Sequence, residues 1–447
     1  MMGGGPKKQP ELLPASNTVI LDEAHQLPGT ASLFFGSSVS TSQLIELARD
    51  TRIEAAASAK DYAALPAAAQ AFDKAARDFR LAFQEDSGRF PFQALARIRG
   101  FGPALNAVCT SLEGLAAQLE SQAERSEGLE KCWQRALALF DQIGRWRDHD
   151  DPELVRWVEL FSHALHLNAT PLSIAGIFQS QISGHARSWI FTSATLSVGG
   201  DFSHYVSQMG LAEGRAQSWD SPFDFASHAL LYVPKGMPEP NTPAYTPAVV
   251  AAALPAIEAS GGRTFMLFTS LRAMREGHEL LKDVFSRRTL DYPLLLQGEG
   301  SRTELLERFR RLGNAVLIGS QSFWEGVDVR GEALSLVVID KLPFAPPDDP
   351  LLAARIERIK REGRNAFVEF QLPQAVITLK QGAGRLIRDE TDRGVLMICD
   401  PRLFSKGYGR RILASLPSMK GTRDIAEVIA FFERADTAYM RVPAGNE

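Results

Sequence analysis

The chain contains 447 residues, of which 45% are hydrophobic and 23% are charged, as is typical of a globular protein with two or three domains. Its net charge of −4 excludes a uniformly basic nucleic-acid-binding protein. Leu351–Arg411 nevertheless holds 13 Lys or Arg against 7 Asp or Glu, which predicts either a local positive face or a solvated helix face. No apolar run approaches the roughly 18 residues of a transmembrane helix, so we expect a cytoplasmic protein without membrane contact.

Two carboxylates and an imidazole follow a short apolar run near the start of the sequence. Val19–Leu21 predicts a buried strand, and Asp22, Glu23 and His25 come directly after it. Ligands bind at the carboxyl ends of strands in α/β sheets. There an aspartate can hold Mg²⁺ through its water shell, and a glutamate can activate an attacking water. The alternative is a strand that ends in an ordinary polar turn.

The composition changes between residues 41 and 165. Ala, Leu, Glu, Gln and Arg dominate there, and apolar residues recur at helical spacing, as at Leu112, Leu115 and Leu119. This spacing predicts an all-helical insertion. Its tryptophans could stack on nucleic-acid bases, but aromatic residues in a helical bundle are more often part of its core, which we favour.

A second strand is predicted after the insertion, within Ser188–Leu196, and it ends in the small hydroxyl residues Thr192, Ser193 and Thr195. Alone, a turn of small hydroxyl residues indicates a capped strand end as readily as a functional motif. The proline-rich run Pro234–Pro247 predicts an interdomain linker, since repeated prolines oppose both helix and central strand.

Beyond that run, short apolar strands alternate with helical patterns, which predicts a second parallel-sheet α/β domain. The expected strands are Thr264–Phe268, Pro293–Leu296, Val316–Ile318, Leu336–Ile339 and Val395–Cys399. The expected helices are Leu271–Phe285, Thr303–Leu312, Leu351–Glu362, Gln374–Gln381, Leu403–Ser415 and an amphipathic helix over Thr422–Arg434. The last helix could dock on its own domain or engage a partner.

Five short motifs occur along the chain. They are Asp22-Glu-Ala-His25, Thr192-Ser-Ala-Thr195, Phe268-Thr-Ser270, Gly319-Ser-Gln-Ser-Phe-Trp-Glu-Gly-Val-Asp328 and Gln381-Gly-Ala-Gly-Arg-Leu-Ile-Arg388. On a helix, Arg385 and Arg388 would lie three residues apart on one face, as two guanidinium groups that reach one phosphate would. Solvated surface arginines are the alternative.

Together these motifs resemble those of the DinG/XPD (Rad3-like) group of superfamily 2 DNA helicases, and most of all its bacterial YoaA type. The resemblance extends from Thr18 to the end of the chain. It implies two RecA-like parallel-sheet domains, the first incomplete, with an inserted all-helical Arch-like domain. The expected boundaries are 1–40 and 166–235 for the first domain, 41–165 for the insertion and 236–447 for the second.

The resemblance also implies roles for individual residues. Asp22 would bind Mg²⁺, Glu23 would activate water, and His25 and Gln381 would sense the nucleotide. Arg385 and Arg388 would stabilise charge on the γ-phosphate of ATP. Further expected roles are coupling of hydrolysis to movement for Ser193 and Thr195, nucleotide or DNA contacts for Glu325 and Asp328, and DNA contacts for Thr269, Ser270 and Ser320.

Two features of the family are missing from the sequence. No Gly-x4-Gly-Lys-Ser/Thr loop occurs in it, and its cysteines are Cys109, Cys132 and Cys399, which cannot supply the four thiolates of an iron–sulfur cluster. Without the loop, the phosphates of ATP lose their cradling amides and lysine. The chain is therefore expected either to be part of an ATP-dependent DNA helicase or to be a catalytically inactive DNA- or protein-binding remnant.

The resemblance further implies partners and a location. Single-stranded or forked DNA is the expected substrate, with 5′ to 3′ translocation in DNA repair or replication. The χ subunit of the polymerase III clamp loader is a candidate partner for the C-terminal helix. The expected location is the bacterial cytoplasm, in association with the nucleoid.

Overall fold

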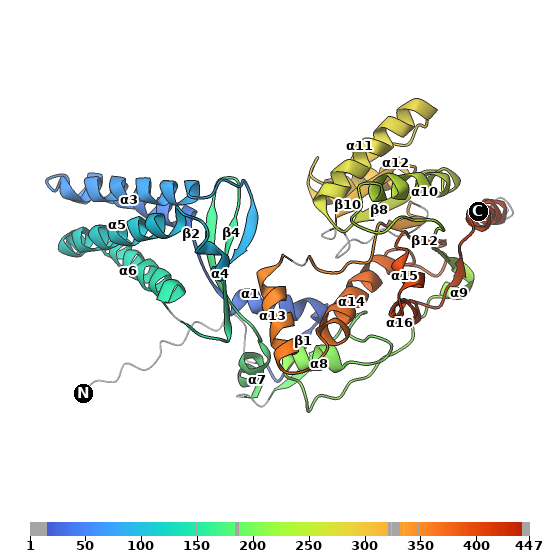
Figure 1. The fold of residues 1–447 in the computed structure, drawn as a ribbon, viewed down its shortest axis with the longest axis horizontal. Coiled ribbons are helices and arrows are strands. Elements are labelled where there is room, and N and C mark those ends of the chain that lie inside the picture. The colour runs from blue at the N-terminus through green and yellow to red at the C-terminus, as the bar shows by residue number, and fades with distance from the viewer. Residues whose placement is uncertain are drawn as a thin grey trace, which may run out of the picture. The chain divides into compact units, whose positions relative to one another are not determined.

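The computed structural model describes residues 16–148, 150–183, 187–320, 323, 331, 333–346 and 348–439 (Figure 1). The chain divides into two compact units. The first contains the chain up to Thr192 together with Val206–Glu213 and Ala345–Ala366; the second contains Ser193–Tyr205, Gly214–Phe344 and the chain from Phe367 onward. Among the described residues, no helix is both long and apolar enough to cross a membrane.

The second unit is built on a seven-stranded parallel sheet with the strand order β13-β7-β12-β11-β8-β10-β9. Its strands are β7 (Ala229–Tyr232), β8 (Thr264–Phe268), β9 (Leu294–Leu296), β10 (Val316–Ser320), β11 (Leu336–Ile339), β12 (Gly394–Ile398) and β13 (Lys420–Thr422). The central strands are buried along their whole length and almost entirely apolar, because helices cover both faces of the sheet. Phe265 and Leu267 pack into the core on one face, while Met266 and Phe268 pack into the core on the other.

The helices of this unit mostly follow the predicted pattern. They are α9 (Phe225–His228), α10 (Tyr245–Ala259), α11 (Leu271–Arg288), α12 (Arg302–Leu312), α14 (Leu372–Ala383), α15 (Arg402–Ser405), α16 (Gly409–Ser415) and α17 (Ile425–Tyr439), with a π-helical turn at Phe367–Gln371. The single helix predicted over Leu403–Ser415 is wrong, because the chain there forms α15 and α16. Gly409 packs against the end of α15 so closely that a Cβ atom would lie 2.0 Å from the carbonyl oxygen of Leu403.

The proline-rich run Pro234–Pro247 lies inside the second unit rather than between the units. It connects β7 with α10, and both of these elements belong to that unit. Pro247 stands in the first turn of α10, where a missing N–H breaks no helical hydrogen bond. The predicted interdomain linker is therefore a loop within one unit.

The first unit contains a two-stranded parallel sheet of β1 (Thr18–Leu21) and β6 (Ser188–Phe191). Both strands were predicted, but β1 is not buried. Ile20 and Ile190 are register partners and remain 64% and 44% exposed, because within the described part of the chain these strands pair only with each other. α1 (Leu27–Phe34) and α7 (Ala175–Ser183) follow the respective strands, and α8 (Ser203–Met209) spans the division between the units.

The insertion combines helices with an antiparallel sheet, so the prediction of helices alone is wrong. Its helices are α2 (Thr41–Ser58), α3 (Ala64–Leu81), α4 (Phe92–Leu95), α5 (Phe101–Gln122) and α6 (Glu127–Asp148). The sheet has the order β2-β5-β4-β3, formed by β2 (Ser37–Ser40), β3 (Gly88–Pro91), β4 (Leu154–Leu160) and β5 (Leu165–Pro171). β4 and β5 pair over their full lengths, and from Leu165 to Ala169 alternate side chains of β5 are buried, a period of two that the helical spacing around it obscured.

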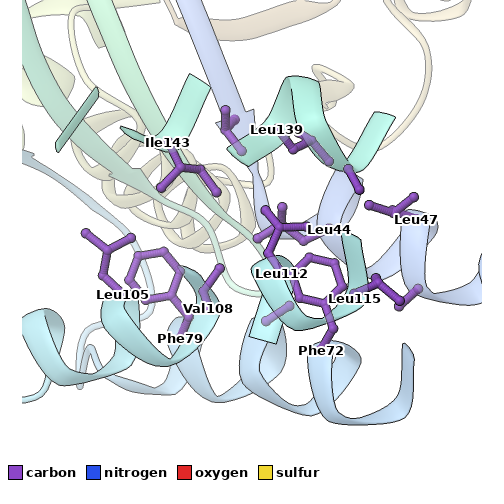
Figure 2. Packing of buried hydrophobic residues seen from close by; sticks show 14 of the residues in the cluster. Leu44, Leu47, Phe72, Phe79, Leu105, Val108, Leu112, Leu115, Leu139 and Ile143 are labelled. Atoms are coloured by element: carbon purple, nitrogen blue, oxygen red, sulfur yellow. The ribbon is translucent and has the colours of Figure 1, made fainter. Parts of the chain in front are cut away.

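The core of the insertion lies between its helices, as Figure 2 shows. Phe72 and Phe79 of α3 pack against Leu105, Val108 and Leu112 of α5, and further leucines come from α2 and α6. Trp146 is buried, which confirms its predicted core position.

One helix that follows β11 in sequence belongs to the first unit. α13 (Pro350–Arg361) packs against β3 and β4. The Arg355 guanidinium donates to the carbonyl oxygen of Leu172 at 3.0 Å and to Ser32 Oγ at 3.0 Å. Arg89 pairs with Asp349, the residue that caps α13, at 2.6 Å. α13 is thus held to the rest of the first unit by half-buried hydrogen bonds and an ion pair.

Candidate functional site

In the first unit, Asp22 and Thr192 lie at the carboxyl ends of paired strands. The Thr192 hydroxyl donates to Asp22 Oδ1 at 2.8 Å, and the Ala24 amide donates to the Thr192 carbonyl oxygen at 2.9 Å. The bond from Thr192 and a backbone amide hydrogen bond from Glu23 lower the pKa of the Asp22 carboxyl. Asp22 is therefore an exposed, ionised carboxylate with a fixed direction.

Glu23 and His25 complete this cluster. Glu23 has left-handed backbone angles (φ 49°, ψ 38°), an uncommon conformation for a residue with a side chain. His25 Nδ1 lies 3.3 Å from Glu23 Oε2, and the His25 side chain is only 5% exposed. The three predicted residues are therefore brought together, with both carboxylates open to solvent.

In the second unit, the turn after β6 contacts the buried helix α14. The chain passes between the units at Thr192–Ser193. Ser193 Oγ accepts a hydrogen bond from the Thr195 amide at 3.2 Å, and Gln381 of α14 donates from Nε2 to Thr195 Oγ1. Gln381 is 7% exposed, so this hydrogen bond is shielded from water. The contact between Thr195 and Gln381, which lie 186 positions apart, was not predicted from the sequence.

The two predicted arginines do not share a helix face. α14 ends at Ala383, and Arg385 and Arg388 lie in the non-helical segment that follows. Gly384 caps the helix with its amide on the carbonyl oxygen of Lys380, and the Arg385 amide bonds Gly382. Arg385 is buried, and the Arg388 amide donates to Asp392 Oδ2 at 2.7 Å. The helix-face argument for this pair is therefore wrong, although both residues remain close to the end of α14.

Hydroxyl side chains gather at the carboxyl edge of the second sheet. Thr269 and Ser270 follow β8, and Ser270 Oγ caps α11 by accepting from the Ala273 amide at 3.3 Å. Ser320 ends β10 and donates from its amide and its hydroxyl to Gln297 Oε1 at 2.7 and 3.0 Å. Parallel strands bring these residues to one edge, as the sequence predicted for strand ends in general.

Two polar residues of this edge were not predicted as site residues from the sequence. Gln297 holds Ser320, and Asp340 accepts hydrogen bonds from both the amide and the hydroxyl of Thr269. Each stands immediately after an apolar strand, the same signal that identified Asp22. Glu325 and Asp328, also predicted as site residues, lie outside the described residues.

The residues present fit Mg²⁺ but not an iron–sulfur cluster. Asp22 offers an exposed, ionised oxygen ligand of the type that Mg²⁺ prefers, and a single carboxylate can hold the ion through its waters. Among the described residues, no group of three or more His, Cys, Asp or Glu could hold a metal ion. Cys132 and Cys399 are buried in the cores of different units, which rules them out as shared cluster ligands.

Comparison with known proteins gives consistent matches. The helicase C-terminal domain family matches residues 253–419. The ATP-dependent DNA helicase YoaA of Escherichia coli is 44% identical over 421 residues, which are 94% of this chain and 65% of YoaA. The ATP-dependent helicase DinG of Mycobacterium tuberculosis is 37% identical over 294 residues, 65% of this chain and 42% of DinG. The chain thus spans less than two thirds of either relative.

A solved XPD helicase structure has the same fold. It matches with a TM-score of 0.56 at 17% identity, over 91% of this chain and 68% of that one. The predicted fold class, α/β with parallel sheets and a largely helical insertion, is confirmed by this likeness together with the two parallel sheets, apart from the antiparallel sheet that the insertion also contains.

Proposed function

Because the chain belongs to the DinG/XPD-like group of superfamily 2 helicases, we propose that it supplies the carboxylate and arginine side of the ATP site of a DNA helicase. The observation that carries this proposal is the pair Asp22 and Thr192, fixed by a hydrogen bond at the carboxyl ends of β1 and β6. This is the sheet edge at which α/β proteins bind nucleotides.

Each of these residues would have its own role in ATP hydrolysis. Asp22 would hold Mg²⁺, which when bound neutralises charge on the phosphates. Glu23 would orient and deprotonate the attacking water, with His25 beside it. Arg385 and Arg388 would stabilise charge on the γ-phosphate, and the bond between Thr195 and Gln381 would link the turn after β6 to these arginines.

The carboxyl edge of the second sheet is the proposed DNA-binding surface. Thr269, Ser270 and Ser320 would contact backbone phosphates, so binding would be independent of sequence and would weaken with salt. Cycles of nucleotide binding and hydrolysis would then drive translocation on a single strand, in the 5′ to 3′ direction, on single-stranded or forked DNA.

The proposed site lacks a phosphate-binding loop within these 447 residues, since no Gly-x4-Gly-Lys-Ser/Thr sequence occurs in them. Ile20 and Ile190, which are register partners in the β1–β6 sheet, are also exposed. We expect the chain alone to show no DNA-stimulated ATP hydrolysis. We expect hydrolysis when the chain is fused to the part of E. coli YoaA that it does not match.

The test is a phosphate-release assay with and without single-stranded DNA. In the fusion, Glu23→Gln should abolish turnover, while the matched change at the exposed Glu276 of α11 should leave it intact. Robust turnover by the chain alone, lost in Glu23→Gln, would contradict the expectation. A fusion that binds DNA without hydrolysing ATP would support the second candidate, an inactive binding remnant.

For a protein partner, the proposal is the χ subunit of the clamp loader, bound at α17. Val428 and Phe432 of α17 are buried against the second unit's core, whereas Ile429 is 36% exposed and available for a contact. Ile429→Glu should reduce χ capture in a pull-down, and Glu433→Lys on the same helix serves as a charge control. Undiminished capture by Ile429→Glu would rule out this surface.

A further inference from the structure

Asp340 is a buried carboxylate that accepts hydrogen bonds from Thr269, a residue of the proposed DNA-binding edge. It follows β11, is 2% exposed, and lies beside the end of β8 because these strands are neighbours. Its Oδ1 accepts from the amides of Lys341 at 2.7 Å and Thr269 at 3.0 Å. Its Oδ2 lies 3.3 Å from the Thr269 hydroxyl. Asp340 therefore fixes both the backbone and the side chain of Thr269.

Several other titratable groups lie around Asp340, and each has its own environment or partner. Tyr245 of α10 donates its hydroxyl to the backbone carbonyl oxygen of Asp340 at 2.7 Å, and burial raises the pKa of Tyr245. Burial also raises the pKa of Cys399, at the end of β12, well above its ordinary value. Asp400 is paired with Arg402 at 2.6 Å. Lys341 extends its ammonium group to Asn241 Oδ1 at 2.8 Å.

The protonation state of Asp340 decides which way the Thr269 hydroxyl can donate. A hydroxyl has one proton and two lone pairs. Opposite an ionised carboxylate, which only accepts, that proton must point inward to Oδ2. Opposite a protonated carboxyl, Oδ2–H donates to Thr269 Oγ1 instead, and the threonine proton is released to point outward. Oδ1 continues to accept from the two amides in both states.

A phosphate oxygen can only accept a hydrogen bond, so it can bond to Thr269 only when the hydroxyl proton points outward. We propose that Asp340 is a positioning residue that couples the Thr269–phosphate contact to the uptake of one proton. The inference rests on the proposed DNA-binding function, within which it assigns a role to a residue outside the recognised motifs. Thr269 is half-buried, so one side of its hydroxyl faces the carboxylate and the other can face a ligand.

The ionisation of Asp340 falls in the range where such coupling is measurable. Burial raises the pKa of Asp340 to about 7, against the lowering effect of its hydrogen bonds from Lys341 and Thr269. A phosphate that accepts from Thr269 favours the protonated carboxyl and raises this pKa further. Binding should therefore be strongest below neutral pH and weaken as the pH rises.

The test is the affinity of the full chain for a fluorescent single-stranded oligothymidylate, measured by anisotropy at constant ionic strength between about pH 6 and about pH 8.5. We expect the dissociation constant of the wild type to rise about tenfold over this range, the effect of one hydrogen bond to a charged group. Asp340→Asn should keep the tight affinity throughout, because its carboxamide N–H always donates to Thr269 while its oxygen accepts the amides.

Two further variants separate positioning from general structural damage. Thr269→Val lacks the hydroxyl and should bind weakly, without the step near pH 7, at all pH values. Tyr245→Phe removes a hydrogen bond to the same residue's backbone but leaves its carboxyl, and should retain the wild-type pH profile. Far-ultraviolet circular dichroism confirms that each variant is folded.

The outcomes distinguish this inference from the function on which it rests. An identical pH profile in wild type and Asp340→Asn, or wild-type binding by Thr269→Val, overturns the inference while DNA binding stands. Failure of the wild type to bind the oligonucleotide at any pH overturns DNA binding by the chain, and the inference with it.

Discussion

At the scale of single residues, the polar groups of the candidate site are held by partners that are distant in the sequence. Thr192 fixes Asp22, Gln381 bonds Thr195, Gln297 holds Ser320 and Asp340 holds Thr269. Thr195 and Gln381 both carry predicted roles, whereas in the other three pairs one partner carries a predicted role and the other fixes the direction of its side chain. Such hydrogen bonds add little net stability, but they leave a costly unsatisfied group when one partner is removed.

Asp340 should make the stability of the second unit depend on pH. Its pKa is about 7 in the folded chain against an ordinary 3.8, so between these values the unfolded chain ionises while the folded chain keeps its proton. The free energy of unfolding therefore falls as pH rises from about 4 to about 7, and levels off above. Asp340→Asn lacks this loss, so its stability relative to wild type should increase by up to about 4 kcal/mol across the window.

Urea unfolding at a series of pH values measures this difference. Asp392→Asn offers a comparison, since Asp392 is also buried but accepts from three backbone amides elsewhere in the unit. A constant difference between Asp340→Asn and wild type across the window would contradict the prediction.

At the scale of elements, α13 shows that a helix can be predicted correctly without its place in the fold being known. Its apolar spacing predicted Leu351–Glu362, close to the observed Pro350–Arg361. Its partners, however, are β3, β4, Leu172 and Ser32 of the first unit, which precede it by more than 180 residues. In the sequence, α13 lies between β11 and α14, and both of these elements carry residues of the candidate site at their ends.

Arg355 should hold α13 in the first unit. It is half-buried, burial lowers its pKa, and it donates hydrogen bonds to Leu172 and Ser32. Arg355→Met should free Pro350–Arg361 to exchange its amide hydrogens faster, at a cost of about 1–3 kcal/mol in local stability. Arg361→Met is the matched control, since Arg361 is exposed and pairs only with Glu357 of its own helix among the contacts described. Equal exchange rates in the two variants would contradict the prediction.

At the scale of the whole molecule, the two units have separate hydrophobic cores. Phe72 is fully buried in the core of the insertion, and Phe309 is fully buried against Phe265 in the core of the second sheet. Domains with their own cores can unfold independently.

We expect two unfolding transitions in scanning calorimetry, each sensitive to one core. Phe72→Ala should lower the midpoint temperature of the first unit's transition only, and Phe309→Ala that of the second unit's only. Each substitution should reduce the free energy of unfolding of its unit by about 3–5 kcal/mol. Both variants replace a buried phenylalanine by alanine, so each serves as the control for the other. A single transition shifted by both substitutions would show that the units unfold as one.

The sequence by itself determined much of the second sheet and the position of its carboxyl edge, where the proposed DNA contacts lie. β8 and β11 coincide with the predicted strands, because strands buried on both faces are continuous apolar runs with clear ends. Polar residues directly after such runs must lie at one edge of a parallel sheet, which placed Asp22, Thr192, Thr269 and Ser320 at strand ends. The family motifs added roles that geometry alone does not supply.

Only the tertiary structure decided which surfaces and partners these elements meet. It left Ile20 exposed, split the helix at Gly409, placed Arg385 beyond α14, and brought Asp340 to Thr269. The physical reason is common to all of them. Local periodicity records that a residue faces an apolar neighbour or a turn, but the identity of that neighbour depends on segments of the chain far away in sequence.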